Sequence, residues 1–345
     1  MASKTAKKAL PSESEYSKLD PREWIPKRPD TMIGSIEPET RTMWVSSSDT
    51  SMAAPKMAQR EVVVNPGILK LIDEIVTNAS DHAIRQAALA DKTGQVKNIK
   101  VTVEKATGVI TVFNDGNGIS SAMHPEHGVH TPELIFGNLF SGSNFDDTKE
   151  RIVGGRNGVG SKGTNIFSKM FGLETVDAPE KKLYKQTWTN NMSEVSKPEI
   201  TKYSKVPYTK FTFLLDYERF GVTGLTDDMY DVIVRRVYDL CATLNSVNVY
   251  FNDEKINCKN FVSYSEAFLV SSAYTTRETI NVDGWNIVVA LNSGDRFDHI
   301  SFVNGVCTSR GGTHVELITK QIVEGLLQLL RRKRLLFVLS MCVTC

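Results

Sequence analysis

Helical and strand-like segments are mixed along this chain without regular alternation, and that order constrains the fold more than any other feature. Residues 68–88 carry apolar side chains at helical spacing, whereas residues 99–104 and 109–113 alternate as the two strands of a hairpin would. Segments typical of strands and of helices then follow in irregular order. We therefore expect an α+β fold, in which helices cover one face of a sheet.

The same periodicities predict the remaining elements. Strands are expected at 182–189, 209–215, 247–257 (a strand and a turn), 285–292 and 300–304. Helices are expected at 131–140, 227–244 and 313–333. The first of these should begin with Thr131 as the N-cap, Pro132 at the first helical position and the acidic Glu133 in the first turn.

Length and charge narrow the possible classes of protein. The chain has 345 residues, with 41 Lys and Arg against 40 Asp and Glu, which gives a net charge of +1. At roughly 100–200 residues per domain, two or three domains fit this length. The near-zero charge argues against a protein that coats nucleic acid with its whole surface, but it leaves room for a local basic patch. Five cysteines are too few for a disulfide-stapled secreted scaffold, and no apolar run is long enough to span a membrane.

The two ends of the chain differ from its middle. Residues 1–15 are small and basic with no apolar run after them, so we expect a disordered basic tail and no secretory signal. At the other end, four basic residues precede the apolar run 335–343, which is too short to cross a bilayer. Cys342 and Cys345 form a C-x-x-C pair with no further metal ligand nearby. We interpret this tail as a buried strand fragment or as the product of a truncated reading frame.

Glu74 and Asn78 lie four residues apart in the first predicted helix, so they share one face of it. A carboxylate can accept a proton from water, and an amide oxygen one turn away can ligate Mg²⁺. The alternative for an isolated pair of this kind is a solvated polar face.

The segment Asn114-Asp115-Gly116-Asn117-Gly118 directly follows a predicted strand. Its glycines would let the backbone approach a flat ligand or another chain closely, and a short polar side chain at the strand end could hydrogen-bond the edge of a base. An ordinary turn is the alternative, because D-G and N-G pairs are common in turns.

Residues 154–163 form a glycine-rich loop, in which five of the ten residues are glycine. Such a loop frees backbone N–H groups to face an anion, and Arg156 and Lys162 add positive charge. Phosphate binding is favoured over a flexible surface loop. The pattern Gly158-x-Gly160-x-x-Gly163 matches the dinucleotide fingerprint formally, but the charged residues 145–153 are a poor buried strand to precede it. The P-loop pattern fails because Ser161 and Lys162 stand in the wrong order.

Two further clusters, one basic and one of histidines, could bind a ligand. Arg331, Arg332, Lys333 and Arg334 end the last predicted helix, where they could complement its dipole or contact DNA phosphates. His124, His127 and His130 have a spacing that could suggest a metal, but they lie in a loop-like stretch without a fourth ligand. We interpret this histidine stretch as a surface segment.

The order of these motifs, a Glu/Asn helix followed by N-D-G-x-G and then a glycine-rich loop, resembles the Bergerat-fold ATPases of gyrase, Hsp90, histidine kinases and MutL. Longer segments are similar to the eukaryotic type II DNA topoisomerases. They include RPDTMIGSIEP (28–38), LIFGNLFSGSNFDD (134–147), GGRNGVGSKGTNIFS (154–168), RRVYDL (235–240) and ISFVNGVCTSRGGTHV (300–315).

This resemblance implies roles for individual residues. Glu74 matches the general base that activates water, and Asn78 matches the Mg²⁺ ligand. Arg331, Arg332 and Lys333 match a basic segment that touches DNA, which favours the DNA interpretation of that cluster. The ATP-binding residues it implies are Asn78, Asn114, Gly142, Ser143, Asn144, Gly155, Arg156, Asn157, Gly158, Val159, Gly160, Ser161, Lys162 and Thr209.

Several positions depart from the family pattern. Gly142 replaces a usual serine, which removes one hydroxyl contact, and Met32 stands where the family has tyrosine in an N-terminal strap that reaches the partner subunit. The family's Gln-Thr-Lys loop, which contacts the γ-phosphate of ATP, has no counterpart at a matching place.

The resemblance also implies the domain organisation. It predicts an ATPase domain with its strap at 16–258 and a partial transducer domain, similar to ribosomal protein S5, at 259–345 with an atypical tail. The expected fold is thus a Bergerat-type α+β sandwich followed by part of a transducer, as the front piece of a longer enzyme.

The implied function is an ATP-operated gate of a type II topoisomerase, with ATP and Mg²⁺ bound, a homodimer closing at the N-terminal gate, and DNA held without sequence preference. A nuclear location is expected, with a viral or cytoplasmic one as the alternative. The alternatives to this function are a nucleotide-binding fragment without turnover, a chaperone or mismatch-repair ATPase and, remotely, a dehydrogenase.

Overall fold

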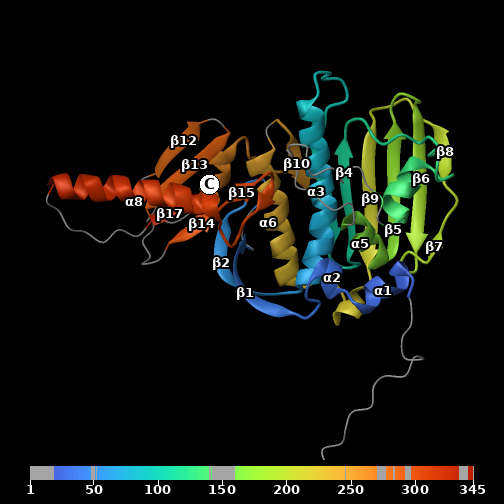
Figure 1. The fold of residues 1–345 in the computed structure, drawn as a ribbon, viewed down its shortest axis with the longest axis horizontal. Coiled ribbons are helices and arrows are strands. Elements are labelled where there is room, and N and C mark those ends of the chain that lie inside the picture. Colours follow the sequence, from blue (N-terminus) through green and yellow to red (C-terminus); the bar gives the residue numbers. More distant parts are fainter. Residues whose placement is uncertain are drawn as a thin grey trace, which may run out of the picture.

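The structure is a computed structural model that describes residues 19–47, 51, 53–139, 141, 160–244, 246–269, 277–282, 284–291, 297–333 and 341–344. Its helices are α1 (Pro21–Lys27), α2 (Asp30–Ile33), α3 (Pro66–Ala88), α4 (Thr131–Gly137), α5 (Gly160–Ile166), η2 (Tyr217–Phe220), α6 (Asp227–Thr243), α7 (Phe261–Glu266) and α8 (Thr313–Lys333) (Figure 1). The strands of the first half are β1 (Glu39–Ser46), β2 (Met57–Val64), β3 (Asn98–Glu104), β4 (Val109–Asp115), β5 (Ser168–Asp177), β6 (Lys182–Thr189), β7 (Glu194–Val195), β8 (Glu199–Lys202) and β9 (Tyr208–Leu215). The later strands are β10 (Asn248–Phe251), β11 (Glu254–Lys255), β12 (Arg277–Val282), β13 (Trp285–Leu291), β14 (Asp298–Ile300), β15 (Phe302–Val303), β16 (Val306–Cys307) and β17 (Met341–Thr344).

A nine-stranded mixed sheet forms the centre of the larger part of the fold. Its strand order is β11-β10-β3-β4-β9-β5-β6-β7, and β8 pairs with β6. Every pairing in it is antiparallel except that of β10 with β3, which is parallel. This arrangement confirms the predicted α+β class, because consecutive strands mostly return beside one another without a helical crossover.

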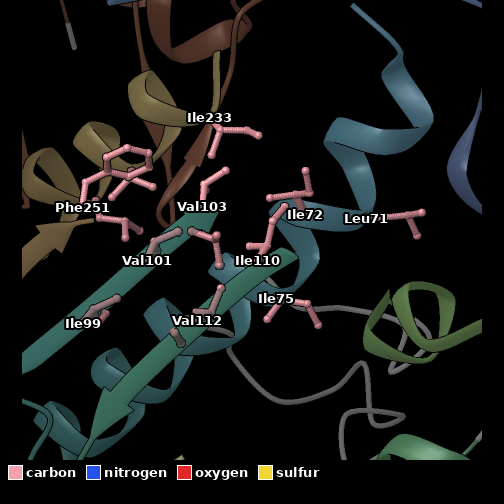
Figure 2. Close-up of a cluster of buried hydrophobic side chains, with 14 of the residues drawn as sticks. Leu71, Ile72, Ile75, Ile99, Val101, Val103, Ile110, Val112, Ile233 and Phe251 are labelled. Atoms are coloured by element: carbon pink, nitrogen blue, oxygen red, sulfur yellow. The ribbon is translucent and has the colours of Figure 1, made fainter. Parts of the chain in front are cut away.

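The core lies between this sheet and the helices α3 and α6. Alternate residues of β3 and β4, such as Val101 and Val112, point toward Ile72 and Ile75 of α3 (Figure 2). Ile233 of α6 faces the same cluster. The strands bury every second residue, and α3 buries one stripe along its length. Both burial patterns agree with the hydrophobic periods of the sequence.

The hairpin of β1 and β2 packs against α6 and not in the main sheet. Val45, Val62 and Val64 of the hairpin form a small separate core with Val232 of α6. Figure 1 shows this hairpin beside α6, on the side of α6 that faces away from α3. The N-terminal segment thereby fixes α6 from the side that the sheet does not cover.

The C-terminal part builds a second sheet, in the order β12-β13-β17-β14. The C-terminal tail was predicted to contain a strand fragment, and its residues 341–344 form strand β17 between β13 and β14. A separate hairpin of β15 and β16 turns at Asn304 and Gly305, whose φ values of 49° and 78° fit a tight two-residue turn. This turn places Gly305 next to Ser80 and Ile84 of α3.

Most of the predicted elements are confirmed within a few residues, with two corrections. Thr131 is the first residue of α4 and not its cap: His130 takes the N-cap position, and the Thr131 hydroxyl donates to the carbonyl of Ala122. Residues 300–304 do not form one strand but belong to β14 and β15. Among the described helices, none has the length and hydropathy needed to cross a membrane.

Candidate functional site

Helix α3 carries the predicted pair Glu74 and Asn78 at the edge of its buried face. The helix begins cleanly because Asn65 caps it, accepting a hydrogen bond from the N–H of Ile68 at 3.1 Å. Glu74 keeps 25% of its side chain exposed and forms an ion pair with Lys70 at 2.5 Å. Both site residues are half-buried, so they can meet solvent or a ligand while the apolar stripe anchors the helix.

The Glu74 carboxylate raises the pKa of Lys70. Burial lowers the pKa of Lys70, but the attraction of the Glu74 carboxylate outweighs it and leaves that pKa above its usual value. The side chain of Asn78 makes no hydrogen bond to another residue that the structure describes.

Helix α5 brings the end of the glycine-rich loop against Glu74. The Thr164 hydroxyl donates to the carbonyl of Leu71 at 2.8 Å and thereby ties α5 to α3. A β-carbon built on Gly160 would overlap the Glu74 carboxylate. Any larger residue there would force the Glu74 side chain or the start of α5 to move, so this close approach gives a reason for one glycine of the loop. Gly160 and Glu74, 86 positions apart in the sequence, are thus neighbours.

Lys162 follows two residues later on α5 and is almost fully buried, with 1% of the residue exposed. Its ammonium group donates a hydrogen bond to the carbonyl of Ser141. Burial lowers the pKa of Lys162 to about 8, because the charged form loses solvation. A partly desolvated cation of this kind interacts strongly with an anion that comes within reach.

Asn114 lies at the end of β4 and faces α3. It is 2% exposed, and its amide nitrogen donates to Nδ1 of His82 at 3.0 Å and to the carbonyl of Asp115 at 2.8 Å. The neighbouring Asp115 instead binds the backbone at the start of β3. One of its carboxylate oxygens accepts from the N–H groups of Lys97 and Asn98 at 2.7 and 2.8 Å. Of the two, Asn114 is the residue whose side chain lies beside the helix that bears Glu74 and Asn78.

His82, which the sequence did not single out, contacts the candidate residue Asn114. Burial, together with repulsion from Arg85, lowers its pKa to about 4, so the ring is neutral at pH 7. A neutral ring can accept from Asn114 at Nδ1 while it hydrogen-bonds the backbone of Asn117. Its spacing on α3, four residues after Asn78, is the only sequence signal that could have placed it on this face.

This histidine predicts a pH dependence of stability. Since the pKa falls from 6.5 unfolded to about 4 folded, the stabilisation is complete above pH 6.5 and is lost as pH falls toward 4. The full effect is roughly 3 kcal/mol in the free energy of unfolding. Urea unfolding of the wild type and of His82→Gln between pH 7 and 4 measures it. The glutamine variant should lose less stability over this range, and parallel curves for the two proteins would contradict the assignment.

Thr209 stands directly opposite Asn114 in the register of β9 with β4. Its hydroxyl lies 2.9 Å from that of Thr175 on β5, and Thr175 also accepts from the N–H of Ile119 at 3.0 Å. A β-carbon on Gly118 would overlap the carbonyl of Val176. The N-D-G-x-G segment is therefore docked on β5 and β9, and Thr175 is a second buried hydroxyl that the sequence did not single out.

The structure brings some of the predicted residues together and leaves others apart. Gly160 lies against Glu74 on α3, Asn114 lies against His82 two turns further along the same helix, and Thr209 stands opposite Asn114 in the sheet. Ser161 lies in the same short helix α5 as Lys162. Outside the described residues lie Gly142, Ser143, Asn144, Gly155, Arg156, Asn157, Gly158 and Val159.

The basic cluster is separate from this site. Arg331 and Arg332 are exposed in the last turn of α8, a helix that extends away from the nine-stranded sheet (Figure 1). Lys333 ends the helix. The three residues therefore do not belong to the Glu74 site. Among the described residues, which include His124, His127 and His130, no group of three or more His, Cys, Asp or Glu side chains is arranged to hold a metal ion.

Two segments of the chain match known protein families. Residues 65–219 match the family of histidine kinase-, DNA gyrase B- and HSP90-like ATPases, and residues 251–338 match the DNA gyrase B family. The solved ATPase region of Saccharomyces cerevisiae topoisomerase II superposes with a TM-score of 0.86 at 37% identity, over 96% of this chain and 85% of that one. The chain belongs to the type II DNA topoisomerase family. Within it, the chain corresponds to the ATPase and transducer region.

Curated topoisomerases are also close in sequence. The DNA topoisomerase 2 of Candida albicans is 41% identical over 348 aligned residues, and that of Acanthamoeba polyphaga mimivirus is 40% identical over 329. These matches cover 96% and 94% of this chain but 23% and 25% of the relatives. The chain thus spans about a quarter of the length of the topoisomerases it matches. The domain boundary at 258–259 stays a prediction.

Proposed function

We propose that this chain binds ATP and hydrolyses it, as the nucleotide-operated gate of a type II topoisomerase. The observation that carries the proposal is the approach of Gly160 to the Glu74 carboxylate. It joins the end of a loop suited to phosphate with a group that can accept a proton from water, and Asn78 stands one turn away on the same helix.

Glu74 is the proposed general base. Its carboxylate is partly exposed, so it can accept a proton from a water molecule that attacks the γ-phosphate. Positioning by α3 and α5 supplies the alignment of the water, which is where most of the catalytic effect in phosphoryl transfer arises.

Asn78 is the proposed protein ligand of Mg²⁺. A single amide oxygen fits this ion, which keeps several water ligands and takes the rest from substrate phosphates. The side chain of Asn78, half-buried and without a hydrogen bond to any other described residue, supports this assignment. When bound, Mg²⁺ would neutralise charge that develops on the phosphate oxygens.

Asn114 and Thr209 are proposed to hold the adenine. Both are buried side by side at the end of the sheet, where polar groups can read the edge of a flat base. The neutral His82 keeps the Asn114 amide in a fixed orientation. Residues Gly142, Ser143 and Asn144 are proposed to contact ribose and phosphate, and the loop from Gly155 to Lys162 is proposed to wrap the phosphates.

The wider role rests on the family. Homodimer closure at the N-terminal gate, sequence-independent DNA contact by Arg331, Arg332 and Lys333, and a nuclear location are parts of the same proposal. Arg331 and Arg332 are exposed, as phosphate contacts require. The mimivirus relative supports the alternative to a nuclear location, which is a viral origin of the chain.

The test measures binding and turnover separately. The purified chain should bind a non-hydrolysable ATP analogue by calorimetry and release phosphate from ATP with Mg²⁺, and added duplex DNA should stimulate that release. Binding without phosphate release would support a nucleotide-binding module instead. Hydrolysis without any DNA response would favour a chaperone-type or mismatch-repair-type ATPase. Binding of NAD but not of ATP would refute the proposal altogether.

A further inference from the structure

Arg236 of α6 holds α3 at two points one turn apart. Its Nε donates to Oδ1 of Asp73, and its Nη2 donates to the hydroxyl of Thr77 at 3.1 Å. The Thr77 hydroxyl in turn lies 3.4 Å from Oδ1 of Asp73. The three side chains form a closed triangle, and only 16% of the Arg236 side chain is exposed.

The two anchor points directly precede the two proposed catalytic positions. Asp73 is followed by Glu74, and Thr77 is followed by Asn78. Adjacent residues of an α-helix are related by a turn of about 100° and a rise of about 1.5 Å, so a clamp on one pair sets the rotation and height of the other. The Arg236 fork therefore controls where the Glu74 carboxylate and the Asn78 amide lie.

Stability alone explains this arrangement poorly. A buried ion pair is often no more stabilising than apolar side chains of similar volume, because both charges lose solvation. In addition, Nη1 of Arg236 is buried without a hydrogen-bond partner among the described residues, which is a further cost. What an arginine provides here is a rigid planar fork that fixes two acceptors at once, which a lysine cannot do.

The helix that carries the fork is itself fixed. The neighbouring Arg235 donates from Nε to Oδ1 of Asp239 at 2.6 Å and reaches the carbonyl of Trp44 on β1. Asp239 also accepts from the Tyr264 hydroxyl of α7 at 2.6 Å. Because β1 and α7 both hold α6 in place, a contact from α6 can fix the position of α3.

We propose that Arg236 is a positioning residue for ATP hydrolysis, which orients Glu74 and Asn78 by clamping Asp73 and Thr77. The inference rests on the proposed function of the Glu74 site. It adds a residue that touches neither nucleotide nor metal but fixes the groups that do. A displacement of about 1 Å in such groups can lower a rate by as much as 10²-fold.

The test compares Arg236→Met, which keeps the length and loses the fork, with Arg236→Lys, which keeps the charge. Arg60→Met is the control, because Arg60 of β2 also forms ion pairs with α6, at Asp228 and Asp231 with distances of 2.6 Å, but contacts neither Asp73 nor Thr77. Three quantities are measured for each variant: kcat for ATP hydrolysis, the Kd of a non-hydrolysable analogue, and amide hydrogen exchange in α3.

For Arg236→Met we expect kcat to fall about 10-fold, Kd to change less than about 3-fold, and exchange at residues 73–78 to rise about 3-fold or more. Arg236→Lys should recover only part of kcat. Arg60→Met should leave all three quantities near those of the wild type.

Each contrary result has its own meaning. Unchanged exchange at 73–78, or an unchanged kcat despite faster exchange, would overturn the inference while leaving the proposed function intact. Equal losses in Arg60→Met and Arg236→Met would reduce Arg236 to a general stabilising contact and would also overturn it. If the wild type itself neither binds nor hydrolyses ATP, the proposed function fails first, and the inference fails with it.

Discussion

Glu74→Gln should lower kcat for ATP hydrolysis by about 10²- to 10⁴-fold while leaving the affinity for ATP almost unchanged. Glutamine has the shape of glutamate, so it can keep its place beside Gly160, but its amide cannot accept the proton of the attacking water. The loss of the ion pair with Lys70 should cost little, because a partly exposed pair contributes only about 0–1 kcal/mol. Phosphate release at saturating ATP measures kcat, and calorimetry with a non-hydrolysable analogue measures affinity.

Lys70→Met is the control for this variant. It removes the same ion pair but leaves the carboxylate, so its kcat should stay within about 3-fold of the wild type if proton transfer is what matters. Full hydrolysis by Glu74→Gln would show that the base is another group. A loss of analogue binding in Glu74→Gln would instead assign Glu74 to nucleotide binding.

The elements that were predictable from the sequence are those whose signal lies within one segment. Helix α3 follows from apolar residues at 68, 71, 72, 75 and 76, all of which are buried. The β3–β4 hairpin follows from alternation at Ile99, Val101 and Val103. Each pattern lies within one segment, so it can be recognised without knowledge of the tertiary structure.

The elements that escaped prediction depend on partners far away in the sequence. Strand β5 has Gly172 in its middle and no clear run of β-branched residues, yet it is held between β6 and β9. The β1–β2 hairpin likewise owes its place to Val232 on α6. Propensity is a weak guide where the tertiary partner decides.

The same limit applies to the candidate site. Glu74 and Asn78 could be paired because helical spacing places them on one face. His82 and Thr175, by contrast, reach the site through contacts with Asn114 and Thr209, which only the sheet order and the packing of α3 create. The motif segments thus indicated the chemistry, whereas the residues that orient them emerged from the topology.

Gly160→Ala should lower kcat by about 10- to 10²-fold, with a smaller effect on stability. The new methyl group would overlap the Glu74 carboxylate, so that side chain or the start of α5 must move. Gly160 is the first residue of α5 and alanine is a good helix former, so unfolding of α5 is not the expected cause of the loss. Rates of phosphate release and thermal unfolding curves, measured on the same preparation, separate the two effects.

Gly172→Ala in β5 provides the matched control. It adds the same methyl group within the same sheet-and-helix unit, but the nearest atom would lie at an ordinary contact distance of 3.5 Å. Its kcat should therefore stay close to that of the wild type. If Gly160→Ala kept full activity, the contact of α5 with Glu74 would be irrelevant to catalysis. If Gly160→Ala lost kcat only in proportion to a loss of folded protein, packing would explain it. A selective loss of kcat would place the end of the glycine-rich loop at the reacting carboxylate.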